Sequence, residues 1–385
     1  MSVKNYDVII IGAGSIGTPL AMSLAEKKLK TLVIEALPSV GQGSNKCAIG
    51  GVRATHSDAS KIKACLRSLE IFSTWHEKYG DDIGWIKGGY LFPVYTGSDE
   101  VMLRDMLKVQ KKLGLNIDWI TPGELRKRVP GAAGKDLRGG TFAPDDGSAS
   151  PLLSINAFYR RAVKLGAEFM FNSGITGFIK ENGTVKGVRT SSGEYRAALT
   201  VNAAGGRAAV LSAMAGVKVP VRPDCHEAGV TEPVKKFFEP MVVDIRPGEK
   251  SKNYYFYQNS EDQIVFCLTP NPPIWGEDRR STSEFLPEVS KRMISLMPAL
   301  ANIKVRRTWR GLYPMTPDGF PIVDFPKSAP GYALAVGMCG QGFMLGPGLG
   351  RALSSVIAGE KNKEALEILA GFKLERNFSS QEKLK

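Results

Sequence analysis

The chain of 385 residues is long enough for two domains, and its composition, 43% hydrophobic and 23% charged, is that of an ordinary globular protein rather than a disordered one. Its formal net charge is +13, but the basic residues are scattered and form no block interleaved with aromatic residues. We therefore do not expect nucleic-acid binding.

Two further features bear on the cellular compartment. The longest apolar run near the N-terminus, Val8 to Ile11, is too short for a membrane span, and the residues before it lack the layout of a signal peptide. Five cysteines form no CxxC pair and suit a reducing compartment better than a disulfide framework. We predict a cytoplasmic protein without a membrane span, and no spacing of histidines or cysteines indicates a metal site.

The first 35 residues predict a βαβ unit that ends in an acidic residue. In chain order we expect a strand at Tyr6 to Ile11, a GxGxxG turn from Gly12 to Gly17, a helix at Thr18 to Lys28 and a strand at Thr31 to Ile34. The glycines allow a tight turn, close approach of a pyrophosphate and close packing of helix against strand, while Glu35 is placed to bind ribose hydroxyls. The unit predicts dinucleotide binding, by either NAD or FAD.

Two later segments also carry small residues between a strand and a helix. In the first, ALTVNAAGG (198–206), the main chain could pass close to a flat ligand, although an ordinary strand-to-helix turn has the same pattern. The second runs from a strand at Tyr332 to Val336 into a helix predicted over Pro347 to Ala358, whose start could stabilise negative charge on a bound ring. We discount GPGLG (346–350) as a second dinucleotide site because its spacing is wrong and no strand ending in an acid follows.

These motifs in this order resemble the D-amino-acid oxidase, glycine oxidase and sarcosine oxidase family of flavoenzymes. The likeness runs through DVIIIGAGSIG, GGVRA, VNAAGG, TPDGFPIVD and GQGFMLGPGLG, and HEAGVTEP with FFEPMVVDIRP further resembles the β-subunits of sarcosine oxidase and dye-linked proline dehydrogenase. It implies oxidation of an amino or imino acid (sarcosine, proline, hydroxyproline or a D-amino acid), in a complex with partner subunits or an electron acceptor.

The resemblance also implies a fold of the α/β class. We expect a discontinuous Rossmann-like FAD-binding domain at 1–85, 151–222 and 316–370, an α+β substrate domain on an antiparallel sheet at 86–150 and 223–315, and a tail at 371–385. The strand-like runs GGYLFPVY, PMVVDI, NYYFYQ and QIVFCLT fall inside the expected substrate domain.

By motif position, the resemblance implies a non-covalent FAD held by several separate segments. The expected contacts are Gly12, Ala13, Gly14, Ser15, Ile16 and Gly17 at the pyrophosphate, Glu35 at the ribose, Ser44, Gly50 and Gly51 along the phosphate and flavin, Ile175 at the adenine, Ala204 and Gly205 on the adenosine side, and Gly340, Gln341, Gly342, Phe343 and Met344 at the flavin's pyrimidine edge. Gly311 stands where monomeric sarcosine oxidases carry the cysteine that binds flavin covalently. An FMN shared with a partner subunit, also non-covalent, is a further expectation from the β-subunit likeness.

The substrate side of the expected site contains an arginine and two tyrosines. Amine oxidation by hydride transfer needs no protein nucleophile, but an amino-acid carboxylate needs an anchor, for which arginine is the natural choice. Many relatives place that arginine before the proline of GLRP, where this chain has Tyr313. We therefore expect Arg53 of GGVRA, whose alternative is a surface arginine, to bind the carboxylate, with Tyr313 and Tyr255 in the same pocket.

The sequence contains three histidines, and it leaves two alternative functions open. We expect a packed structural role for His226 and a surface position for His76. His56, three residues from Arg53, has a better claim than His226 to lie near the active site, but this is the minority interpretation. The run QIVFCLT lacks the lysine that sarcosine-type oxidases use near the flavin to activate oxygen. The resemblance therefore favours a dehydrogenase over an oxidase. A 2-hydroxy-acid dehydrogenase and an electron-transfer subunit without its own substrate site remain alternatives.

Overall fold

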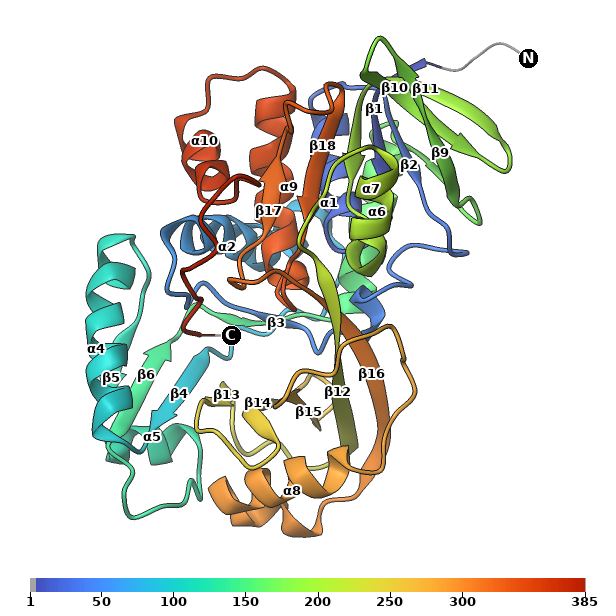
Figure 1. The fold of residues 1–385 in the computed structure, drawn as a ribbon. Helices are drawn as coiled ribbons and strands as arrows, with labels where there is room; N and C mark the ends of the chain where they lie inside the picture. Colours follow the sequence, from blue (N-terminus) through green and yellow to red (C-terminus); the bar gives the residue numbers. More distant parts are fainter. Residues whose placement is uncertain (1–4, 385) are drawn as a thin grey trace.

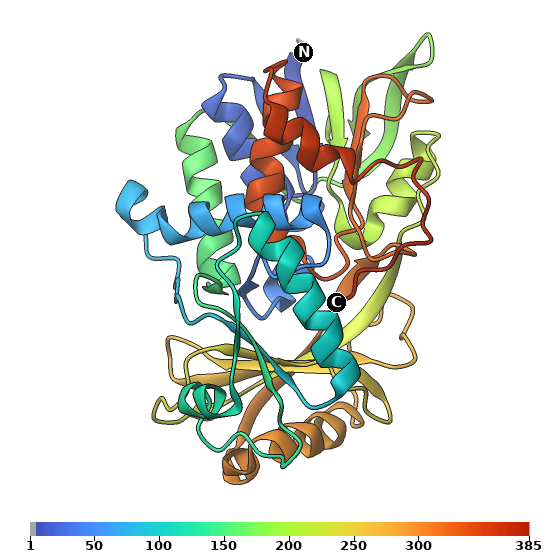
Figure 2. The same ribbon diagram turned by 90° about the vertical axis from the view of Figure 1, so that its left-hand side faces the viewer.

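The computed structural model describes residues 5–384 and is built around two eight-stranded sheets, which lie one above the other in Figure 1. The upper sheet contains the N-terminal strand, and the lower sheet contains strands from two separate stretches of the chain. Figure 2, turned by 90°, shows the same two layers from the side.

The upper sheet is mainly parallel, with the order β17-β18-β11-β1-β2-β8 and a hairpin, β9 and β10, attached to β11. Its strands are β1 (Asn5–Ile11), β2 (Thr31–Ile34), β8 (Glu168–Met170), β9 (Ile175–Glu181), β10 (Thr184–Thr190), β11 (Gly193–Asn202), β17 (Ile322–Asp324) and β18 (Tyr332–Val336). The first two confirm the strands predicted from the β-branched runs.

Both faces of the upper sheet are covered, which explains why β1 is apolar at successive positions. Val8 and Ile10 belong to one core, whereas Ile9 and Ile11 belong to another. The first core is shared with helices α1 (Gly17–Glu26), α2 (Ala59–Ser73), α6 (Pro151–Lys164), α9 (Gly342–Ile357) and α10 (Lys363–Ala370). The second contains residues of α7 (Ala208–Met214) and of the hairpin; α3 (Trp75–Tyr79) continues from α2.

The lower sheet has the order β16-β12-β15-β14-β13-β4-β6-β5. Its strands are β4 (Tyr90–Val94), β5 (Asp118–Ile120), β6 (Gly139–Ala143), β12 (Arg222–Pro233), β13 (Met241–Asp244), β14 (Ser251–Gln258), β15 (Gln263–Pro270) and β16 (Val305–Met315). All pairs are antiparallel except β4 with β13, where the two stretches of chain meet. The expected antiparallel sheet is therefore present with one parallel pair.

The two faces of the lower sheet pack against different partners. Leu91, Tyr254 and Phe266 face a core shared with helices α5 (Pro122–Arg128) and α8 (Phe285–Leu296). Tyr90 and Tyr257 lie on the other face, with Cys267, Leu384 and α4 (Gly97–Lys112). A short ladder of β3 (Gly51–Val52) and β7 (Gly147–Ser148) lies beside this second face, because a Cβ added at Gly51 would come within 1.8 Å of the Tyr90 hydroxyl.

The prediction for the last long helix was wrong at its start. Helix α9 begins at Gly342, so Pro347 lies inside it rather than in its first turn. The glycine-rich run is helical because its glycines let the helix pack on other backbones: a Cβ at Gly346 would lie 1.9 Å from the carbonyl of Ser15, and one at Gly348 would lie 1.9 Å from that of Ala64. The glycines of GPGLG therefore serve close packing of this helix.

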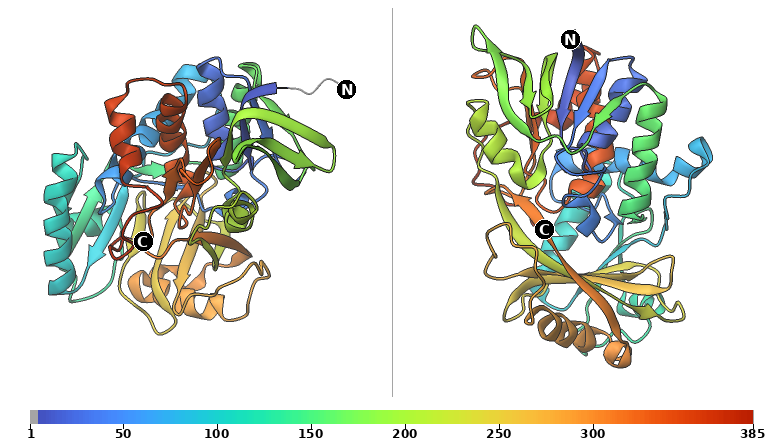
Figure 3. Two further views of the ribbon diagram at one scale, coloured as in Figure 1. Left: turned by 45° about the horizontal axis from the view of Figure 1, so that its top comes forward. Right: turned by 90° about the vertical axis from the view of Figure 1, so that its right-hand side faces the viewer.

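The segment expected to be a tail packs into the molecule. After α10 and a turn, residues 376–384 run along the upper layer toward the lower one, so that the chain end lies near the middle of Figure 1 and of both views in Figure 3. Glu382 and Leu384 are buried. The bounds proposed for the two domains stay a prediction.

Candidate functional site

The GxGxxG turn lies at the carboxyl end of β1, and each of its glycines has a separate geometric reason. Gly12 has φ of +105°, and a Cβ there would come within 2.7 Å of the carbonyl oxygen of Ala203. A Cβ at Gly17 would come within 1.9 Å of the Gly12 oxygen, whereas one at Gly14 would meet nothing within 4 Å. Two glycines therefore serve packing, and the middle one leaves room for a ligand.

The predicted adenosine residues lie around the same turn. The carboxylate of Glu35 accepts hydrogen bonds from the amides of Ala13 at 2.8 Å and Leu37 at 2.9 Å. The carbonyl of Glu35 accepts from the amide of Ser173, two residues before Ile175, and Ala204 contacts Gly12. Three separate segments therefore meet at the carboxyl ends of β1, β2 and β11, as a dinucleotide site in this kind of sheet requires.

A second group of predicted residues lies between the turn and the lower sheet. The hydroxyl of Ser44 donates to the carbonyl of Leu312 at 2.9 Å, which ties this loop to β16. Gly50 has φ of +91°, and a Cβ there would lie 2.3 Å from the Ala149 carbonyl. The hydroxyl of Tyr257 on β14 donates to the carbonyl of Ile49, so the lower sheet holds the Gly50-Gly51 turn directly.

The third group, Gly340 to Met344, forms the start of α9. A Cβ at Gly340 would lie 2.1 Å from the ring of Tyr313, so this loop contacts the predicted substrate side. The side chain of the N-cap residue, Gln341, makes no capping hydrogen bond to the amides at the start of α9. Gln341 is buried, and its Oε1 has no hydrogen-bond partner among the described residues.

These three groups fit FAD. The open space at Gly14, the start of α1 without a capping side chain and the unpartnered Gln341 amide oxygen are the features that a long polar ligand would complete. The residues would hold its pyrophosphate at Gly12–Gly17 and its ring system near the start of α9.

The substrate side of the site contains two tyrosines that contact each other. The hydroxyl oxygens of Tyr255 and Tyr313 are 2.6 Å apart. The Sγ of Cys267 lies 3.9 Å from the hydroxyl oxygen of Tyr313. Burial raises the pKa of both tyrosines well above its usual range, so both hydroxyls are neutral. The sequence placed these two residues, 58 positions apart, in one pocket, and the structure brings them together.

Arg53 is buried rather than on the surface, with 6% of its area exposed. Its Nη2 donates to the carbonyl of Leu384 at 2.6 Å, and its guanidinium lies 5.7 Å from the ring centroid of Phe92. Its Nη1 is buried without a hydrogen-bond partner, and no carboxylate of residues 5–384 lies within ion-pair distance of it. Arg53 lies by the same face of the lower sheet as the tyrosines but forms no hydrogen bond with either.

The histidines differ from the expectation in one respect. His56 is fully buried behind the Arg53 loop, and burial holds its pKa well below its usual range, so it is neutral. His226 is packed, as expected, but its ring stacks on Tyr313 with 3.8 Å between centroids, and its Nε2 lies 3.0 Å from a carboxylate oxygen of Asp224. His226 therefore lies closer to the predicted pocket than the sequence indicated, and His76 is exposed.

Several residues that support the site carried no signal in the sequence. Asp146 accepts hydrogen bonds from the amide of Ala54 at 2.9 Å and the hydroxyl of Thr55 at 2.7 Å, which fixes the loop that carries Arg53. Burial raises the pKa of Asp146 to about 6. Lys61, also buried, forms an ion pair with Glu382 at 3.1 Å. Each pair joins distant positions, so no local pattern could have indicated them.

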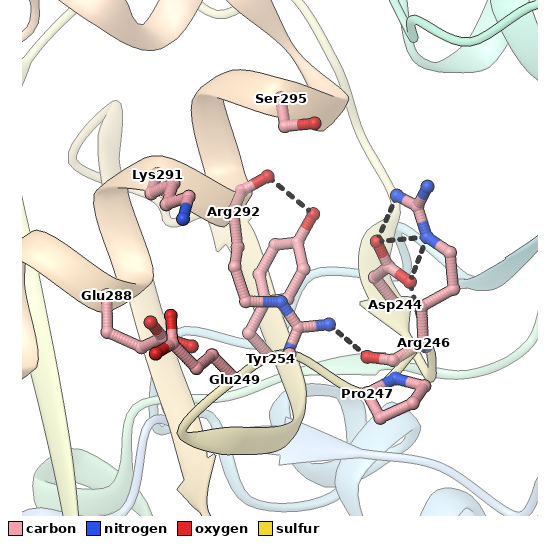
Figure 4. Close-up of a pocket in the computed structure, with 10 residues that line it drawn as sticks. Asp244, Arg246, Pro247, Glu249, Tyr254, Glu288, Lys291, Arg292 and Ser295 are labelled. Atoms are coloured by element: carbon pink, nitrogen blue, oxygen red, sulfur yellow. Dashed lines mark hydrogen bonds and ion pairs between the residues drawn. The ribbon is translucent and has the colours of Figure 1, made fainter.

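A second cluster of charged residues lines a hollow on the far side of the lower sheet (Figure 4). Its centre is the ion pair of Arg246 with Asp244, in which two guanidinium nitrogens contact the carboxylate at 2.5–3.0 Å. The Arg246 carbonyl accepts a hydrogen bond from Arg292. None of the predicted site residues lines this hollow.

Comparison with known proteins agrees with this geometry. Residues 7–356 match the family described as FAD dependent oxidoreductase (DAO), and the chain therefore belongs to that family. It is an enzyme of the oxidoreductase class that binds FAD non-covalently.

Two relatives and one solved structure are similar to this chain over nearly its whole length. The chain is 28% identical to the sarcosine oxidase subunit beta of Arthrobacter sp. over 97% of its own length and 91% of that protein's, and 24% identical to the glycine oxidase of Bacillus subtilis over 98% and 99%. The crystal structure of L-proline dehydrogenase from P. horikoshii superposes with a TM-score of 0.89 at 30% identity, covering 95% of this chain and 96% of that one.

The described part of the chain also contains no transmembrane helix candidate, because no helix within residues 5–384 is both long enough and apolar enough to cross a bilayer.

Proposed function

We propose that this protein oxidises a small amino or imino acid, of the sarcosine, proline, hydroxyproline or D-amino-acid type, at the carbon next to nitrogen. The observation that carries the proposal is Arg53, a buried cation with an unused N–H group and no carboxylate partner in the described chain. A buried guanidinium is stabilised most by a carboxylate that accepts two of its hydrogens. An amino acid supplies that carboxylate.

The residues around Arg53 would bind and orient the substrate. Arg53 would bind the carboxylate, while the paired hydroxyls of Tyr255 and Tyr313 would act as neutral donors and acceptors for the rest of the molecule. The apolar face formed by Tyr90 and Phe92 would exclude water from this space. FAD, when bound, accepts the hydride that leaves the substrate carbon.

We further propose that the protein acts as the β-subunit of a complex and passes electrons to a partner or acceptor rather than to oxygen. Support comes from the named relatives, a sarcosine oxidase subunit beta and an L-proline dehydrogenase, and from the missing lysine on β15. An FMN shared with the partner subunit stays a prediction of the same kind.

The test is anaerobic reduction of the purified yellow holoenzyme. Sarcosine, L-proline, hydroxyproline and D-alanine are each mixed with the protein, in parallel with the 2-hydroxy acids glycolate and lactate, and loss of the flavin absorption is recorded. We expect bleaching by at least one amine and by neither hydroxy acid. Bleaching by a hydroxy acid alone would replace the proposal with 2-hydroxy-acid oxidation, and bleaching by none would favour an electron-transfer subunit.

A further inference from the structure

The segment from Arg376 to Leu384, called the strap below, is fixed to the molecule by two ionic contacts. Arg376 binds Asp318 with Nε and Nη2, at 2.7 and 3.0 Å, in the TPDGFP turn that follows β16. Glu382 forms an ion pair with Lys61 of α2 at 3.1 Å, and both side chains are fully buried. The hydroxyl of Ser57 donates to the same carboxylate at 2.6 Å.

The end of the strap lies in the space assigned above to the substrate. The side chain of Leu384 is buried in the apolar cluster that contains Tyr90, Phe92 and Cys267. Its carbonyl accepts the hydrogen bond from Arg53. The strap therefore contacts both the proposed carboxylate anchor and the apolar wall of the pocket.

The contact between Arg53 and Leu384 satisfies the guanidinium only in part. A carbonyl is a neutral acceptor, and hydrogen bonds from a guanidinium to a carboxylate are shorter and about twice as strong as neutral ones. One nitrogen of Arg53, Nη1, stays buried without a partner among the described residues. A carboxylate that reaches this side chain would therefore be preferred over the Leu384 carbonyl.

We propose that Leu384 is a residue of the substrate site, where its carbonyl competes with the substrate carboxylate for Arg53 and leaves when substrate binds; this inference rests on the function proposed above for Arg53. The buried ion pair of Glu382 with Lys61 keeps the strap attached while the residues after Glu382 move away from Arg53 and return to it. The strap thereby shields a buried cation from water in the free enzyme and raises the concentration of carboxylate needed to fill the site.

The first experiment measures binding of acetate, a carboxylate that cannot be oxidised in this way, to the holoenzyme through the change in its visible flavin spectrum. We compare the full chain with a chain that ends at Glu382, which keeps the ion pair with Lys61, and with Leu384→Gly, which keeps the carbonyl but loses the buried side chain. Because a competing closed state raises the apparent Kd by the inverse of the open fraction, we expect truncation to lower the Kd at least about tenfold and Leu384→Gly to lower it about threefold.

Glu375→Gln is the control for a substitution beside the strap that leaves the strap intact, because Glu375 directly precedes the strap and is exposed. We expect its Kd for acetate to equal that of the full chain. An unchanged or higher Kd in both the truncated chain and Leu384→Gly would overturn the proposal.

The second experiment reports on the strap itself and does not depend on catalysis. Hydrogen exchange is followed by mass spectrometry in a peptide that covers residues 382–384, with and without saturating acetate. We expect acetate to speed exchange at least about threefold in the full chain and to have no effect in Arg53→Met. Slower exchange with acetate would mean that the strap closes over the ligand, and the competition proposal would then be wrong.

The two proposals fail in different ways. If no amine reduces the flavin but acetate still releases the strap, the proposed function is wrong and the competition at Arg53 stands. If an amine reduces the flavin while acetate affects neither the exchange nor the Kd series, the function stands and the strap proposal is wrong.

Discussion

Two arginines on opposite faces of the lower sheet are held in opposite ways. Arg246 is bound by both oxygens of Asp244 and lies 3.7 Å from the ring centroid of Tyr95, with 33% of its side chain exposed. Arg53 is almost fully buried, has one carbonyl as its acceptor and keeps one nitrogen unpartnered within the described chain. Arg53 therefore lies where burying a charge costs more free energy, yet it has fewer polar partners than Arg246.

This difference separates a structural arginine, Arg246, from Arg53, the arginine that we propose to bind the substrate. Asp244 already neutralises Arg246 at the hollow in Figure 4, and this pair fixes the end of β13. Burying Arg53 with no carboxylate within ion-pair distance among the described residues is unfavourable for the free protein, and the substrate carboxylate that we propose would supply the missing partner. The predictions below test this comparison, beginning with the largest expected effect.

Replacing Arg53 by methionine removes the charge and keeps much of the side-chain volume. We expect kcat/KM for the best amine substrate to fall about a thousandfold, or about 4 kcal/mol, because the carboxylate loses a buried charged partner. The free energy of unfolding should stay the same or rise, since an unpaired buried cation is lost. Anaerobic flavin reduction and urea unfolding measure the two quantities, and a variant that retains full activity would contradict the assignment.

Replacing Arg246 by methionine should have the opposite pattern. Asp244 is buried and would lose its ionic partner, so we expect the free energy of unfolding to fall by about 3 kcal/mol, less than for a fully buried pair because Arg246 is partly exposed. The kinetic constants should change less than twofold. A large loss of activity without a loss of stability would mean that the hollow takes part in catalysis.

Asp146, which holds the loop that carries Arg53, makes the free energy of unfolding depend on pH. The pKa of this carboxyl is about 6 in the folded chain against 3.8 without the fold, so the folded state binds more protons between these values. Its contribution to stability is therefore present below about pH 4 and is lost as pH rises toward 6, by at most about 3 kcal/mol. Asp146→Asn, which does not titrate, should lack this loss.

The measurement is urea unfolding at several pH values from 4.5 to 7, with Asp145→Asn as the control. Asp145 pairs with Lys87 at the surface, and its pKa is lowered, so its own contribution has the opposite sign and is small. A wild-type curve parallel to that of Asp146→Asn would contradict the prediction.

The smallest expected effect concerns the tyrosine pair. Tyr313→Phe removes one hydroxyl of the contact with Tyr255 but keeps the ring that stacks on His226. We expect kcat/KM to fall about tenfold, or about 1.4 kcal/mol, as for one hydrogen bond. Arg53→Met should exceed this effect clearly, and stopped-flow reduction of both variants compares them. An equal loss of kcat/KM in both variants would mean that Arg53 and Tyr313 act as one unit.

The FAD-binding part could be predicted from the sequence because its requirements are local. Gly12, Gly14 and Gly17 lie within six positions, and Glu35 directly follows the next strand, so local spacing and apolar runs predicted the turn, both strands and the first helix. The start of α9 was predicted wrongly because proline usually marks a first turn, whereas contacts of Gly346 and Gly348 with distant backbones keep this helix intact through Pro347.

By itself, then, the sequence determined the nucleotide-binding turn, the two-sheet architecture through its resemblance to a family, and the candidates Arg53, Tyr255 and Tyr313. Only the tertiary structure decided that Arg53 is buried without a carboxylate partner in the described chain and that Leu384, 331 positions later, lies against it. The reason is physical: whether a charge is paired depends on which distant groups the fold brings within a few ångströms, and no local pattern carries that information.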